Sequence, residues 1–247
     1  MAFGPDSPLR RLPAALDERQ PVFYDAIRYS GQMVSIAYNR LRTGLYNAGK
    51  TFPEGGVIKQ PFEPIFLDAW SVVDSTHRFS RLIHSTPDIE HGTPVKLFER
   101  RIAGIEELRN GVQHLHDEEI RKLVQNKLPA FGSLSWAYLP DIEAKRLWIC
   151  TLLSGSIVTS KGHPIVNPID KDFDLPVDHI ELTAFGTTVS ISKVYRAVES
   201  LGESLEAVIA PQVKEHPHLA SDASVVMMLG WNETQAEPAE SSAAPSQ

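Results

Sequence analysis

The feature that most constrains this chain is a change of hydrophobic period just after Pro129. Before that residue, apolar side chains recur every three or four positions, which is typical of amphipathic helices. After it, Ser133 to Leu139 alternates between apolar and polar residues, and Arg146 to Leu153 is a more continuous apolar run, as in strands. A second helical pattern then follows. The order predicts a mostly α fold: an up-and-down helical bundle with an appended small antiparallel β layer, in the α+β class.

Helices are predicted over 20–46, 62–84, 94–127 and 192–210, and strands inside 131–154 and 179–191. Thr93-Pro94 is a helix-start signal, so 94–127 is expected to form one long helix, and Ser192 is expected to cap the last one. These elements are expected to form three parts. They are a helical bundle from 14–127 plus 192–215, a β insertion at 131–191, and a disordered tail at 232–247 that is rich in Ala, Glu, Pro and Ser.

The single cysteine, Cys150, excludes a disulfide within the chain and favours a reducing compartment. It lies in the second apolar strand pattern, where we expect an inert core thiol. No stretch approaches the roughly 18 apolar residues of a membrane helix. The chain is therefore expected to be soluble and cytoplasmic, with no membrane partner.

Charge is distributed unevenly along the chain. The formal net charge is −7, which argues against a broad nucleic-acid surface. Residues 1–127 are nearly balanced, with 17 Lys and Arg against 16 Asp and Glu, whereas 128–247 carry 7 against 15. If RNA binds, we expect it to bind the N-terminal half of the chain. The acidic C-terminal half is expected to be a solvated surface.

The stretch from Arg109 to His116, Arg-Asn-Gly-Val-Gln-His-Leu-His, carries the most chemistry. Arginine can hold a phosphate with a planar fork of N–H donors, and histidine can move a proton near neutral pH. Asn110 and a second histidine, His114, lie between Arg109 and His116. This combination is what RNA cleavage without a metal would require.

Helical geometry adds two residues from the preceding helix. At 100° per residue, Arg109 and His116 fall close to the apolar stripe of the third predicted helix, and His77 falls on that of the second, one turn after Asp74. The sequence therefore predicts a pocket between the two helices, in which Asp74 and His77 would contact the substrate. In the alternative interpretation, Arg109 pairs with a carboxylate, the histidines bond locally, and nothing is catalysed.

Arg109-Asn110-x-x-x-His114 resembles the R-N-x-x-x-H signature of the HEPN superfamily (higher eukaryotes and prokaryotes nucleotide-binding). His116 also satisfies the looser spacing of that family. The resemblance implies a helical bundle, often dimeric. Many members are metal-independent ribonucleases of toxin, antiphage and RNA-processing systems. It also implies that Arg109, Asn110 and His114 carry the chemistry. Geometry favours His116 as the partner of Arg109 and the motif favours His114, and a kink at Gly111 could reconcile them.

Two functions are therefore expected as alternatives. The first is a HEPN-like endoribonuclease that acts as a homodimer on RNA without a cofactor, using Arg109, Asn110, and His114 or His116. The second is a non-catalytic interaction module in which a structural Arg and His network supports binding of a protein partner, such as an antitoxin.

No metal site is predicted from the sequence. Asp170 to Glu181 has carboxylates at several positions of a calcium loop, but Leu175 stands where that loop requires glycine. His114 and His116 point about 160° apart on a helix and cannot chelate one ion. A zinc site would need histidines from other segments.

Overall fold

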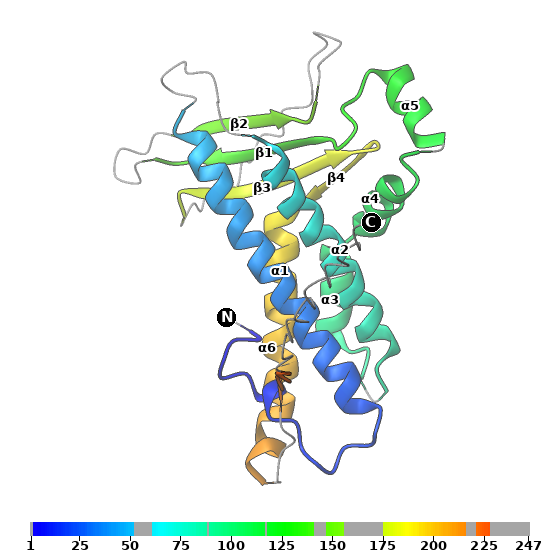
Figure 1. Cartoon of the computed structure of the whole chain (residues 1–247), viewed down its shortest axis with the longest axis vertical. Coiled ribbons are helices and arrows are strands. Elements are labelled where there is room, and N and C mark those ends of the chain that lie inside the picture. Colours follow the sequence, from blue (N-terminus) through cyan, green and yellow to red (C-terminus); the bar gives the residue numbers. More distant parts are fainter. Residues whose placement is uncertain are drawn as a thin grey trace, which may run out of the picture.

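The computed structural model describes residues 2–51, 61–87, 89–116, 118–140, 147–155, 175–215 and 221–227. The predicted tail at 232–247 and the first part of the Asp170 to Glu181 stretch, residues 170–174, lie outside these residues. Over the described part, six α-helices and a four-stranded antiparallel sheet confirm the α+β prediction (Figure 1). Among these helices, none combines the length and the apolar character that a bilayer span requires.

Two long helices form the centre of the bundle. α1 (Gln20–Gly49) runs up to the sheet, and α2 (Glu63–Ser85) returns alongside it (Figure 1). Each carries proline in its first turn, where the missing N–H costs no hydrogen bond. α6 (Ile191–Glu215) packs against both and continues through Pro211, so that it ends five residues beyond the predicted end at 210.

The prediction of one long helix over 94–127 is wrong. The segment forms α3 (Thr93–Arg101), α4 (Ile105–Gln113) and α5 (Glu118–Asn126). The first break lies at Gly104, whose φ of 92° is in the left-handed region that glycine adopts readily. A Cβ at this position would lie 2.8 Å from Cγ2 of Val189, so contact with the sheet requires the glycine.

The sheet has the order β2-β1-β3-β4, and all its neighbouring strands are antiparallel. Its strands are β1 (Ser133–Tyr138), β2 (Trp148–Leu153), β3 (Val177–Ala184) and β4 (Thr187–Ser190). β1 is central and buried along its whole length. β3 begins two residues earlier than predicted, and the pairing of β1 with β3 is irregular between Ser135 and Ala137.

Helices and strands share one hydrophobic core. Its buried members come from both layers and include Tyr38, Phe79, Ile83, Trp136, Tyr138, Ile180 and Val198. Ser192 was predicted to cap α6. It lies instead where the helices meet the sheet. Its hydroxyl accepts a hydrogen bond from the Ile180 N–H at 3.0 Å and lies 3.1 Å from the Tyr38 hydroxyl. The capping contact comes from Ser190, whose Oγ accepts from the Lys193 N–H at 3.5 Å.

A short segment after α6, residues 221–227, contacts the start of the bundle through one carboxylate. Asp222 accepts a hydrogen bond from Arg28 Nη2 at 2.8 Å and another from the Tyr29 hydroxyl at 2.6 Å, and it also pairs with Arg10. Arg28 is buried, and its charge is paired with this carboxylate and with that of Asp25, whose Oδ1 lies 3.1 Å from Nη2. The carboxylate of Asp222, and not apolar packing, holds the segment in place, because the valines and the methionine that follow it remain exposed.

Candidate functional site

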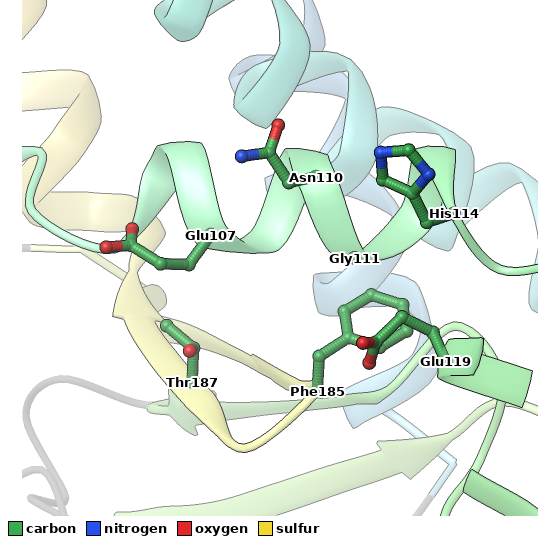
Figure 2. A pocket seen from close by; sticks show the side chains of 7 residues that line it. All are labelled: Glu107, Asn110, Gly111, His114, Glu119, Phe185 and Thr187. Atoms are coloured by element: carbon green, nitrogen blue, oxygen red, sulfur yellow. The ribbon is translucent and has the colours of Figure 1, made fainter. Parts of the chain in front are cut away.

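An open pocket of about 580 Å³ lies beside α4. Its lining comes from α4, from α5 and from the hairpin of β3 and β4: Glu107, Asn110, Gly111, His114, Glu119, Phe185 and Thr187 (Figure 2). Two of the predicted catalytic residues, Asn110 and His114, are exposed and leave α4 on the same side, one turn apart. The structure therefore brings this polar pair together on an accessible surface.

Gly111 is where α4 packs closely on the hairpin of β3 and β4. The ring of Phe185 lies against it, and a Cβ at position 111 would be 2.3 Å from that ring. The helix has no break at this glycine that could bring His114 and His116 to equivalent positions, because α4 is continuous from Ile105 to Gln113. The glycine permits close approach of the sheet instead. Sequence reasoning missed Phe185 and Thr187, and the only local signal for this turn was Gly186.

Arg109 lies on another side of α4 and contacts α2. Its Nε donates to Oδ1 of Asp74 at 3.2 Å, and its Nη1 donates to Oε1 of Gln113 at 3.1 Å. Arg78 donates to the other oxygen of Asp74 at 2.9 Å. Asp74 and Arg109 therefore lie together between the two helices, as predicted, but they form the arginine–carboxylate pair that the non-catalytic alternative expects. The side chain of Arg109 remains 25% exposed, so the guanidinium is held in place and still accessible to solvent.

His77 lies close to this ion pair. Burial lowers the pKa of its imidazole, and the charges of Arg109 and Arg81 lower it further against the opposing effects of Glu106 and Asp74. A neutral ring at physiological pH follows from this environment. His77, Arg81 and Glu106 line a second cavity of about 300 Å³, which also includes Glu107 of the first pocket.

His116 does not occupy the predicted inward position. α4 ends at Gln113, His114 forms its C-cap, and His116 is exposed in the turn that follows. The predicted inward position of His116 depended on a continuous helix over 94–127. The predicted set is thus divided, with Asp74, His77 and Arg109 between α2 and α4, and Asn110 and His114 at the open pocket.

The charge of the open pocket restricts what can bind there. Glu107 and Glu119 both line it, and neither belongs to the motif. Two carboxylates disfavour a phosphate unless a cation enters with it. Within this pocket, His114 is the group that can exchange a proton near neutral pH, and Asn110 can donate and accept hydrogen bonds.

Comparisons with protein-family models, with curated proteins and with solved structures give no match for this chain.

Proposed function

We propose that this protein is a metal-independent endoribonuclease of the HEPN type, with its site on α4. The observation that carries the proposal is the accessibility of the motif: Asn110 and His114 line one open pocket, and the side chain of Arg109, on another side of the same helix, is 25% exposed. A histidine and an arginine that served only to hold helices together would be expected to be buried in a closed network.

Each residue has a separate role in this proposal. His114 exchanges a proton with the 2′-hydroxyl or the leaving oxygen as general base or acid. Asn110 orients the phosphate or the histidine, and Arg109 stabilises the negative charge that develops on the phosphate. Asp74 and Gln113 hold the guanidinium at two of its nitrogens, which reduces the freedom that Arg109 loses when RNA binds.

A second copy of the chain completes the site in this proposal. Arg109 and His114 are five residues apart, which places them about 140° apart around a helix. One protomer therefore presents them on different sides of α4. A homodimer that juxtaposes two α4 helices would place the arginine of one copy near the histidine of the other, and would add positive charge opposite Glu107 and Glu119.

The test is cleavage of single-stranded RNA by the purified chain and by Arg109→Ala and His114→Ala. Each variant should lose about 10²–10⁴-fold in rate while keeping its circular dichroism spectrum. Lys96→Ala, an exposed residue of α3, is the matched control. Cleavage should persist in EDTA. An equal mixture of the two inactive variants should recover part of the activity if each site takes residues from both protomers.

A second candidate is a non-catalytic interaction module, which is favoured by two observations. Arg109 already has a carboxylate partner in Asp74, and an apolar cavity of about 730 Å³ lies next to α4. Its lining includes aromatic and aliphatic side chains: Phe62, Phe66, Leu67, Trp70, Val112 and Phe131. If the wild type cleaves no RNA and Arg109→Ala only lowers the melting temperature, this second function replaces the first.

A further inference from the structure

Three side chains with metal-binding chemistry meet where α2 ends and α3 begins. His84 lies in the last turn of α2, His91 lies in the connection, and Glu99 lies on α3. One ligand atom from each lies within 4.8 Å of the other two. Nε2 of His84 is 3.0 Å from Oε1 of Glu99, and the rings of His84 and His91 are 5.0 Å apart.

We propose that His84, His91 and Glu99 form a binding site for a divalent first-row transition metal, with Zn²⁺ as the reference ion. Two imidazoles and one carboxylate are a donor set that Zn²⁺ accepts, with bonds of about 2.0–2.2 Å. The same set also suits Fe²⁺. No sequence spacing revealed this site, because the three residues are seven and eight positions apart and the turn between the helices brings them together.

The distances require only small side-chain movements for coordination. In a tetrahedral site with such bonds, neighbouring ligand atoms are separated by about 3.3 Å. His84 and Glu99 already lie at nearly this separation, and the three atoms together lie within 4.8 Å. His84 and His91 are exposed and Glu99 is half-buried, so their rotamers can adjust without disturbing the core. The negative end of the α2 dipole, at its last turn, also favours a cation beside His84.

Three protein ligands leave at least one coordination position for water or another ligand. His84 and Glu99 both line the cavity of about 300 Å³, and Arg81 lies on the same cavity. An anion bound to the metal could therefore also contact a guanidinium. This site is separate from the pocket that contains Asn110 and His114, and it does not depend on the proposed ribonuclease activity.

The experiment uses the full chain without an affinity tag, stripped with EDTA and dialysed. Isothermal titration with ZnCl₂ should give one site per chain with a dissociation constant in the micromolar range or below, and Zn²⁺ should raise the melting temperature. Co²⁺ should give the visible absorption bands of a four- or five-coordinate ion, which reports its coordination directly. His84→Ala and His91→Ala should each weaken Zn²⁺ binding at least tenfold, and Glu99→Gln should also weaken it.

His116→Ala is the matched control, since it removes one exposed histidine from another surface. It should leave the affinity for Zn²⁺ unchanged. The proposal is overturned if the wild type binds Zn²⁺ only at millimolar concentration, or if His84→Ala and His91→Ala bind it as the wild type does. Circular dichroism of each variant without metal establishes that it is folded, so a loss of affinity reports on the site.

Discussion

The ring of Phe185 occupies the space that a side chain at position 111 would need, since a Cβ there would lie 2.3 Å from Cδ2 of the ring. This contact joins the Arg109 to His116 motif to the turn between β3 and β4. Phe185 has a φ of 53°, which is unusual for a residue other than glycine, and its ring also lies 6.1 Å from that of Trp70. The position of α4, and so of Asn110 and His114, depends on this junction.

Replacing Gly111 with alanine should therefore destabilise the protein. In an open helix interior, this change would stabilise by up to about 1 kcal/mol, because alanine has the higher helix propensity. Here the added methyl group must displace the Phe185 ring, and overpacking of this kind costs about 1–3 kcal/mol. Differential scanning calorimetry should show a lower melting temperature for Gly111→Ala.

The control for this change is the same substitution in a Phe185→Ala background. With the ring removed, alanine at position 111 should cost much less than it does in the wild type. A Gly111→Ala variant that melts at or above the wild-type temperature would show that α4 does not pack on the hairpin in this way.

The sequence predicted those features that depend on local pattern. α1, α2 and α6 were predictable because each buries one face, and β1 and β2 because they alternate or form an apolar run. The proximity of Arg109 and Asp74 was also predictable, since both were expected in a pocket between two helices, but their ion pair was expected only in the non-catalytic alternative. By contrast, the break at Gly104 follows from contact with Val189, which lies 85 positions later in the chain.

The errors at the site follow from that break. Once α4 ends at Gln113, the helical angle that placed His116 beside Arg109 no longer applies. The cluster of His84, His91 and Glu99 was not predicted, because a tight connection between helices leaves no period in the sequence. At Gly104 a contact distant in sequence determines what local propensity leaves open.

Cys150 should be unreactive in the folded protein. It is buried in β2, and burial raises the pKa of its thiol to about 12. The thiolate is the reactive species, so its population at neutral pH is very small. Ellman's reagent should label the native chain only slowly, and should label one thiol per chain at once in denaturant. Rapid labelling without denaturant would contradict the buried position of Cys150.

Acid should weaken the attachment of the segment at 221–227. Hydrogen bonds from Arg28 and Tyr29, together with the charges of Arg28 and Arg10, lower the pKa of the Asp222 carboxyl to about 2, against about 3.9 in an unfolded chain. A carboxyl with a lowered pKa in the folded state contributes stability above its unfolded pKa, and that contribution is lost as the pH falls toward 2.

Asp222→Asn should therefore melt at a lower temperature than the wild type at neutral pH, and this difference should shrink between about pH 4 and pH 2. Thermal melts over this range measure the effect. Ser221→Ala changes no charge in the same segment and serves as the control. If Asp222→Asn and the wild type have the same melting temperature at neutral pH, the buried Arg28 does not depend on Asp222.

The last prediction concerns the electrostatics between α2 and α4. Burial and the charge of Arg109 both lower the pKa of His77, so in the folded protein it should titrate below the usual value of about 6.5. Its neutral form is favoured by folding. The stability that this gives is present above the unfolded pKa and is lost as the pH falls through the folded one.

Arg109→Ala should raise the pKa of His77, and Asp74→Asn should lower it, because Asp74 acts in the opposite direction. The chemical shift of the imidazole C–H protons measures both changes, with Lys96→Ala as a control that removes a charge from α3. An unchanged His77 titration in Arg109→Ala would mean that the guanidinium does not lie between the two helices, and both functions proposed for Arg109 would then lose their structural basis.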